Sequence, residues 1–272
     1  LGTSGVIFLV SDKYLPAAND GAHSFCHAIP NKWHLMSVIL SATDSLNWLS
    51  EITGKEVSQM MENMNDDNTE PSNLMFHPYL SGERTPHNDA SAKASFLNIT
   101  RSSSINDLVR SVVEGVSYAF ADCIKVFENA GEKPKRLIAA GGGSQSAKWL
   151  EIISTVTKTT IDIPENSEHI AALGAARLGI LASNNSSDFN SILIQPKIKY
   201  SINPQLEKFE DDFCKYSKAK YAVAVSNCTA ALHLSLMALG IGKDDEVIIP
   251  DLTFVADANA VLACNAKPVV TD

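Results

Sequence analysis

The sequence predicts a mixed α/β fold in two parts, and three observations support this. Strand-like and helix-like patterns alternate over residues 1–181, and the alternation starts again over residues 206–272. Between these stretches, residues 183–187 read Ser-Asn-Asn-Ser-Ser, which is typical of a linker. The length of 272 residues allows one large domain or two moderate domains, each able to bury a core.

The composition argues against several classes of partner. A formal net charge of −9 disfavours nucleic acid and anionic membranes, because both need clustered Lys and Arg. No apolar run is long enough to span a bilayer. The five cysteines are scattered and form no CxxC pair, which favours a reducing cytoplasm. His23, Cys26, His27 and His34 lack the spacing of a closed zinc site, so we expect no metal there.

Local patterns predict the elements of the first part. Residues 6–10 are typical of a strand, and residues 33–38 lead into a helical stretch. Ser104 and Asp107 have the spacing of a helix N-cap and its third helical position, and a broad apolar helical face follows them. Gly131 is expected to end that helix, because glycine commonly follows a helix C-terminus.

A second strand–turn–helix pattern follows in the same part. Residues 136–140 look like a short buried strand that runs into three glycines, and a helix carrying Trp149 and Leu150 comes next. We expect a loop over residues 164–168. Residues 171–181 then form a helix of small residues suited to close packing.

The second part repeats the alternation. Its predicted strands and helices make βαβ units, which belong to larger sheets, so this part reads as the opening of an α/β fold. The strands are expected at residues 221–225, 246–250 and 268–271, and the helices at residues 230–239 and 255–263.

Gly2-Thr3-Ser4-Gly5 is a turn of small residues whose backbone N–H groups could close on a phosphate. It runs directly into a strand, so we expect a further strand, outside this sequence, to feed it. The turn is one residue too short for the G-x-S-x-G elbow of hydrolases, and no convincing His/Asp pair follows it. We therefore interpret it as a phosphate turn.

Residues 141–143 are all glycine and form a second candidate turn, at a helix start that favours an anion or a polar ring edge. No lysine follows, as a P-loop requires. The dinucleotide-binding fingerprint needs Gly or Ala at the position of Ser146. Asp162 and Glu165 do lie near the sequence separation at which that fingerprint has an acidic residue to bind the ribose. A tight turn without a ligand remains open. Two such turns without a P-loop favour an actin-like (ribonuclease H-like) ATPase arrangement.

Three stretches make the first part recognisable: His23-Ser24-Phe25-Cys26-His27, Trp33-His34-Leu35-Met36-Ser37-Val38 and Pro78-Tyr79-Leu80-Ser81-Gly82-Glu83-Arg84-Thr85-Pro86-His87-Asn88. Together they resemble the xylulokinases of the FGGY carbohydrate kinase family, from Leu1 to about Pro196. The second family signature maps through Phe96, Asp107, Leu108, Ser111 and Glu114. It departs at Asn98, where the signature has glycine, and Asn is the residue after glycine that best accepts a positive φ.

The resemblance implies transfer of the γ-phosphate of ATP, bound with Mg²⁺, to D-xylulose, so the partners are a nucleotide and a small sugar. The family's catalytic aspartate and most sugar-binding groups precede the stretch matched here. We therefore assign no catalytic residue and no metal ligand, and expect the chain alone to be inactive. The ATP contacts implied are Gly2, Thr3 and Ser4 at the phosphates, Gly142 and Gly143 at the adenosine, and Ala147 and Asn47 beside them.

Residues 83–85 read Glu-Arg-Thr within the resembling stretch. We expect them to form a structural loop with a buried salt bridge rather than a catalytic site.

The second part has a resemblance of its own, carried by residues 220–226, 229–234, 242–250 and 253–261. It looks like the start of a DegT-type sugar-nucleotide aminotransferase, with the fold type I of transferases that use pyridoxal phosphate (PLP). The resemblance implies that Cys228, Thr229 and Ala230 cup the phosphate of PLP and that Phe254 stacks on its ring. Cys228 departs from the usual Gly or Ala. The Schiff-base lysine would lie beyond Asp272.

The expected organisation is therefore a kinase-type nucleotide-binding domain over residues 1–196, a junction over residues 197–205 and a partial aminotransferase segment over residues 206–272. Two alternatives remain. The chain could be a module that binds nucleotide without catalysis, or a fragment of an enzyme defined by its aminotransferase half.

Overall fold

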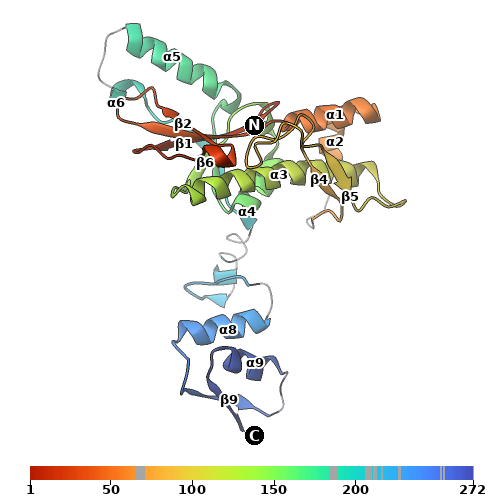
Figure 1. Cartoon of the computed structure of the whole chain (residues 1–272), viewed down its shortest axis with the longest axis vertical. Helices are drawn as coiled ribbons and strands as arrows, with labels where there is room; N and C mark the ends of the chain where they lie inside the picture. The colour runs from red at the N-terminus through yellow and green to blue at the C-terminus, as the bar shows by residue number, and fades with distance from the viewer. Residues whose placement is uncertain are drawn as a thin grey trace. The chain divides into compact units, whose positions relative to one another are not determined.

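A computed structural model provides the structure of the chain (Figure 1). It divides into two compact units, Leu1–Gln205 and Leu206–Asp272. The structure describes residues 1–64, 71–183, 189–205, 210, 213–215, 217–225, 228–251, 253 and 255–271.

The first unit begins with an antiparallel three-stranded sheet in the order β1-β3-β2. Alternate residues of the first strand point to opposite faces, so Ile7 is buried while Val6, Phe8 and Val10 are exposed. A 3₁₀ turn, η1 (Ala18–Asp20), precedes the second strand. The strands are β1 (Gly5–Ser11), β2 (His23–Cys26) and β3 (Trp33–Ile39).

Helices and one small hairpin continue the unit. They are α1 (Thr43–Thr53), α2 (Val57–Met64), the paired strands β4 (Met75–His77) and β5 (Ser95–Leu97), and α3 (Ile105–Asn129). Between the hairpin strand β5 and α3, Asn98 has a φ of 64°, so asparagine does occupy a left-handed position where the family has glycine.

Helix α3 is the long helix that runs across the first unit in Figure 1. Ser104 and Asp107 form the predicted capping box, in which each side chain accepts a hydrogen bond from the other's amide. Gly131 follows the helix with a φ of 90°, as predicted. One face of α3 is buried in a core shared with β1, β3, α1, α2 and α4. Its fully buried members include Val109, Val112, Val113, Val116, Cys123 and Phe127.

A second sheet, in the order β6-β7-β8, completes the first unit. The first two strands are parallel and the third is antiparallel to its neighbour. Helix α5 exposes Leu173, Leu178 and Ile180. The elements are β6 (Arg136–Ile138), η2 (Gly142–Gln145), α4 (Ala147–Thr157), β7 (Thr160–Pro164), η3 (Ser167–His169), α5 (Ile170–Ser183), α6 (Phe189–Ile192) and β8 (Ile198–Ile202).

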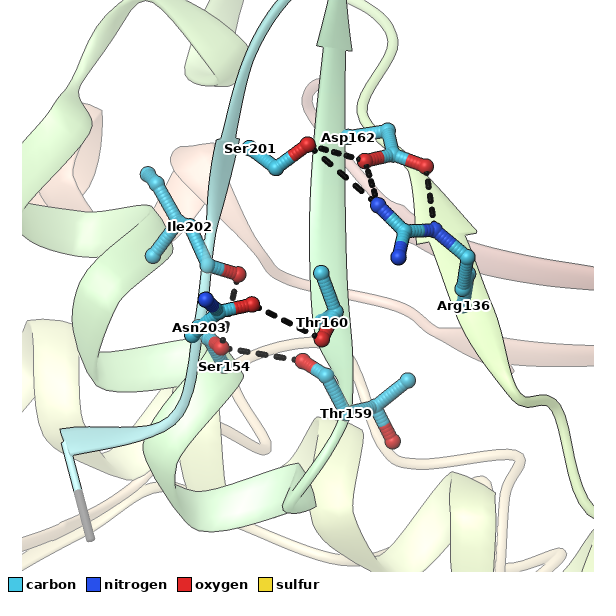
Figure 2. Close-up of polar contacts among 8 residues, drawn as sticks. All are labelled: Arg136, Ser154, Thr159, Thr160, Asp162, Ser201, Ile202 and Asn203. Carbon is cyan, nitrogen blue, oxygen red and sulfur yellow. Dashed lines mark hydrogen bonds and ion pairs between the residues drawn. The ribbon is translucent and has the colours of Figure 1, made fainter. Parts of the chain in front are cut away.

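The stretch expected as a junction, residues 197–205, contains the strand β8 (Ile198–Ile202). Side chains fasten this strand to the sheet (Figure 2): the Ser201 hydroxyl donates to Asp162 on β7, and the Ser154 hydroxyl on α4 donates to the Ile202 carbonyl at 3.3 Å. The Thr160 hydroxyl donates to Asn203 Oδ1 at 3.0 Å. Strand pairing over a long sequence separation leaves no local signal, which is why the sequence did not predict it.

The two sheets of the first unit present facing strand edges. β1 lies at the edge of one sheet and β6 at the edge of the other, and a cavity of about 700 Å³ is lined by both. The lining includes the exposed Val6, Phe8 and Val10 of β1 and Ile138 of β6. These edges carry backbone groups available for further strand pairing.

The second unit contains a parallel β-α-β motif, as predicted. β9 (Glu246–Pro250) and β10 (Lys267–Thr271) pair in parallel through α9 (Ala256–Ala263), and α8 (Cys228–Ala238) precedes them. The expected strand over residues 221–225 is wrong, because those residues are described without a strand. The buried apolar cluster is small: Ile249, Val261, Cys264 and Ala266.

Among the helices of the described residues, none combines the length and the apolar character needed to cross a membrane.

Candidate nucleotide site

The two glycine-containing turns of the first unit meet at Leu1. The Leu1 amine donates to the Ala140 carbonyl at 2.7 Å, at the end of β6, and the Gly143 amide donates to the Leu1 carbonyl at 3.0 Å. Residues 1–4 and 140–143 therefore lie side by side, although they are about 140 positions apart in the chain.

The start of α1 holds the first turn from its other side. The Ala42 amide donates to the Thr3 carbonyl at 2.9 Å, and the Thr43 amide donates to the Gly2 carbonyl at 3.0 Å. The first amides of this helix are thus used to fix the turn. The amides of Thr3 and Ser4 find no protein acceptor within the described residues, so they are available to an anion.

A cavity of about 440 Å³ opens between these turns and the helices α1, α2 and α4. Its wall combines backbone, hydroxyl and amide groups with apolar side chains, and none of the described residues that line it is ionisable. Such a wall suits a ligand with an apolar ring and an anionic end. The lining residues are Gly2, Thr3, Thr43, Leu46, Asn47, Val57, Met61, Gly142, Gly143, Gln145, Ser146 and Trp149.

The structure brings together most of the residues expected at the nucleotide. Gly2, Thr3, Asn47, Gly142 and Gly143 all line this one cavity. The other two lie beside it and are exposed: Ser4 in the first turn and Ala147 at the start of α4.

Sequence reasoning did not assign Met61, Gln145 and Trp149 to the site. Trp149 was recognised only as an apolar residue of a helix, and it is 2% exposed. An apolar residue that packs in a core and one that lines a cavity have the same helical spacing, so no signal in the sequence separates them.

The three consecutive glycines differ in what surrounds them. A Cβ atom on Gly143 would lie 2.7 Å from Leu1 Cδ2, whereas a Cβ on Gly142 would meet nothing within 4 Å. Gly141 has a φ of 88°, and a Cβ there would lie 2.7 Å from the Leu1 carbonyl oxygen. Gly141 and Gly143 therefore allow the two turns to approach each other, and Gly142 leaves the cavity open.

No group of three or more His, Cys, Asp or Glu side chains in the described ranges could hold a metal ion. Nor does a carboxylate occur among the cavity-lining residues that the structure describes. These residues therefore do not fit a Mg²⁺ site made by protein ligands alone.

The loop at Glu83 differs from its prediction. Glu83 is buried, and its Oε1 atom accepts hydrogen bonds from the backbone amides of Leu40 (3.1 Å) and Arg84 (2.7 Å); no salt bridge joins it to another described side chain. Burial raises the pKa of Glu83 to about 7, against the opposing effect of these two hydrogen bonds. Thr85 is also buried, and its hydroxyl donates to the Gly21 carbonyl at 3.0 Å.

In the second unit, the start of α8 carries the residues expected at the PLP phosphate. Cys228 and Thr229 are exposed and Ala230 is half-buried. Helix-start amides with a hydroxyl suit a phosphate group, so these residues fit that part of PLP. Phe254 lies outside the described residues.

Comparisons with known proteins agree with both resemblances. Residues 1–183 match the model of the FGGY family of carbohydrate kinases, C-terminal domain, and residues 185–272 match that of the DegT/DnrJ/EryC1/StrS aminotransferase family. The xylulose kinase of Escherichia coli (strain K12) is 40% identical over 212 residues, which cover 77% of this chain and 43% of the relative. That of Klebsiella pneumoniae is 38% identical, over 71% of this chain and 40% of the relative.

Solved structures show the same fold. A structure described as a xyloylose kinase from Brucella ovis has a TM-score of 0.71 and 36% identity, over 88% of this chain and 47% of its own. Plasmodium falciparum glycerol kinase with ADP has a TM-score of 0.66 and 19% identity, over 80% and 45%. The predicted actin-like α/β fold of the first part and the aminotransferase-type segment after it are confirmed. The chain spans less than half the length of these relatives.

Proposed function

Because this chain belongs to the FGGY family of carbohydrate kinases, we propose that its first unit is the nucleotide-binding lobe of a xylulose kinase. The parent reaction would transfer the γ-phosphate of ATP to D-xylulose, giving ADP and D-xylulose 5-phosphate. Support comes from the 40% identity to a curated xylulose kinase and from one structural observation: two backbone turns meet at one cavity whose described lining residues carry no charge.

In this proposal each side of the cavity binds a different part of the nucleotide. The open amides of Thr3 and Ser4 bind the phosphates, because backbone N–H groups in a turn attract an anion without needing a charged side chain. Gly142, Gly143 and Asn47 border the adenosine, and Ala147 lies beside it at the start of α4. Mg²⁺ enters with the phosphates as part of the substrate.

The chain by itself is proposed to be inactive. Phosphoryl transfer needs a base beside the acceptor hydroxyl, and no carboxylate or imidazole is among the described residues that line the cavity. The base and the sugar-binding groups would come from another part of a longer protein. A module that binds nucleotide without catalysis is the alternative, and turnover by such a longer protein would exclude it.

The experiment is titration of the whole chain with MgADP and MgATP by calorimetry. We expect binding, and we expect Gly142→Val to weaken it about tenfold, because Gly142 lines the cavity and a Cβ atom there would meet no protein atom within 4 Å. Gly174→Val is the matched control, since Gly174 on α5 also has nothing within 4 Å and lies outside the cavity lining. No nucleotide binding, or equal affinity in all three proteins, would contradict the proposal. ADP release should not depend on D-xylulose.

For the second unit we propose a phosphate-binding site that belongs to the aminotransferase family, whose members use PLP. Cys228, Thr229 and Ala230 would hold the phosphate and Phe254 would stack on the ring; PLP, when bound, supplies the chemistry of amino-group transfer. Equilibrium dialysis with PLP tests this. Thr229→Val should reduce retention, and retention equal to that of the unchanged chain would contradict the assignment.

We also propose that the kinase-type part extends to Gln205. β8 pairs with β7, and the Escherichia coli relative covers a larger share of the chain than residues 1–183 make up. We propose a reducing cytoplasm as the compartment of the chain, on the scattered spacing of the five cysteines in its sequence.

A further inference from the structure

β3 extends beyond the end of β2. There the side chains of Glu83 and Thr85 accept backbone hydrogen bonds that a neighbouring strand would otherwise accept. β2 pairs with β3 only as far as Met36. Beyond it, the Val38 amide donates to Thr85 Oγ1 at 3.0 Å, and the Leu40 amide donates to Glu83 Oε1 at 3.1 Å. The Thr85 amide returns a hydrogen bond to the Val38 carbonyl at 3.2 Å. The loop therefore satisfies backbone groups that β2 leaves uncovered.

Leu40 leads directly into the contacts that hold the phosphate turn. One residue separates Leu40 from Ala42, whose amide donates to the Thr3 carbonyl, and the next amide, of Thr43, donates to the Gly2 carbonyl. A shift of the Leu40 backbone would be passed to both carbonyls over this short distance. The buried loop and the exposed turn are thus connected through backbone hydrogen bonds.

We propose that Glu83 is a positioning residue for the turn of residues 2–4. Its carboxylate fixes the backbone of Leu40 and therefore the nearby amides at the start of α1. Those amides hold the turn in the conformation that leaves the Thr3 and Ser4 amides free to bind a phosphate. The importance of this position for binding rests on the nucleotide-binding function proposed above.

The surroundings of Glu83 support a geometric role. The side chain is 1% exposed, and its Oε2 atom has no hydrogen-bond partner within the described residues. A buried carboxyl group with an unpaired oxygen costs free energy. The two amides bound by Oε1 offset part of that cost, and one of them is the amide that leads to the phosphate turn.

The test compares Glu83→Ala, Glu83→Gln and the control Ser154→Ala in the whole chain. Ser154 is fully buried on α4, and its hydroxyl donates to the carbonyls of Thr159 and Ile202 (Figure 2), so its loss lowers stability away from the turn. Two quantities are measured: MgADP affinity by calorimetry, and hydrogen exchange at the amides of Ala42 and Thr43.

We expect Glu83→Ala to weaken MgADP binding about tenfold and to speed exchange at Ala42 and Thr43. Glu83→Gln keeps a carbonyl acceptor and should stay within about twofold of the unchanged chain. Ser154→Ala should alter neither quantity. Should Glu83→Ala fail to fold, Glu83→Asp gives the same comparison, because it keeps the charge and withdraws the oxygens by one methylene.

The outcomes separate this proposal from the one it rests on. Unchanged exchange at Ala42 and Thr43 in Glu83→Ala would overturn the positioning role. Faster exchange with undiminished MgADP affinity would overturn it too, since the turn would then not control binding. If the unchanged chain binds no MgADP but exchange is faster in Glu83→Ala, the positioning role stands and the nucleotide-binding function fails.

Discussion

Asp162 on β7 accepts a hydrogen bond from Ser201 on β8 at 2.5 Å (Figure 2). The same carboxylate accepts a hydrogen bond from Arg136 Nε on β6 at 2.7 Å. One buried side chain therefore joins all three strands of the second sheet, including β8, which lies in the stretch expected as a junction.

Asp162→Asn should destabilise the first unit by about 1–2 kcal/mol, a modest loss because Arg136 is largely exposed. The hydrogen bond from Arg136, with a smaller contribution from Ser201, holds the pKa of Asp162 below its usual value of 3.8, against the effect of burial. The stabilisation is therefore present above that pH and is lost as the pH falls below it. Urea unfolding at pH 7 and pH 3 measures this. If the two proteins differ in their free energy of unfolding by the same amount at pH 7 and at pH 3, this prediction is contradicted.

Glu83 should show the opposite dependence. Burial raises its pKa to about 7 from 4.5, so the folded chain holds the proton more tightly than the unfolded chain. Stability linked to this group is present below about pH 4.5 and is lost as the pH rises through about 7. The positive charge of Arg84 opposes this rise in the pKa of Glu83. Tyr79 and Cys123 also interact electrostatically with the Glu83 carboxylate.

Between pH 5 and pH 8, the free energy of unfolding of the unchanged chain should therefore fall by about 2 kcal/mol relative to that of Glu83→Gln, whose side chain cannot titrate. Denaturant unfolding of both proteins across this range provides the measurement. Parallel pH profiles would show that the Glu83 carboxyl group keeps an ordinary pKa.

Gly143→Ala should destabilise the chain more than Gly142→Ala does. The added methyl group at Gly143 presses on the Leu1 side chain, whereas at Gly142 it enters open space. We expect a difference of about 1–2 kcal/mol in thermal or denaturant unfolding. Conversely, Gly142→Ala should reduce nucleotide affinity without loss of stability. If the two variants are equally stable, the Leu1 side chain does not lie against Gly143 in solution.

Limited proteolysis should leave a resistant fragment that ends near Gln205. β8 is held by backbone pairing and by side chains, whereas the buried apolar cluster in the described part of the second unit contains four residues. A region that buries so little apolar surface opens easily. Mass spectrometry of the fragments provides the measurement. Early cleavage within Ile198–Ile202, or a resistant fragment over residues 206–272, would contradict this prediction.

Phe8→Lys should reduce self-association of the chain. Phe8 is 50% exposed on an edge strand, next to Val6 and Val10, which are also exposed. Charged residues on such an edge oppose pairing between molecules. Light scattering against concentration tests this, with Tyr14→Lys as a control, because Tyr14 is equally exposed but lies outside the strand. If both substitutions have an equal effect, the edge of β1 is not the surface through which the chain associates.

Elements whose signals are local could be predicted from the amino-acid sequence. The capping box of α3 needs only Ser104 and Asp107, and the positive φ of Asn98 follows from the tolerance of asparagine for that conformation. The turns at residues 2–5 and 141–143 were recognisable because small residues and glycines are required wherever a backbone must approach closely.

Which of these pieces meet depends on the folded arrangement of the chain. That Leu1 binds Gly143, that β8 joins β7 and that Glu83 binds Leu40 depend on contacts between distant residues, which have no fixed spacing in the chain. Residues 221–225 have the composition of a strand but are described without one. A strand exists only with a partner that accepts its backbone hydrogen bonds, so its formation is a property of the assembled sheet rather than of its own residues.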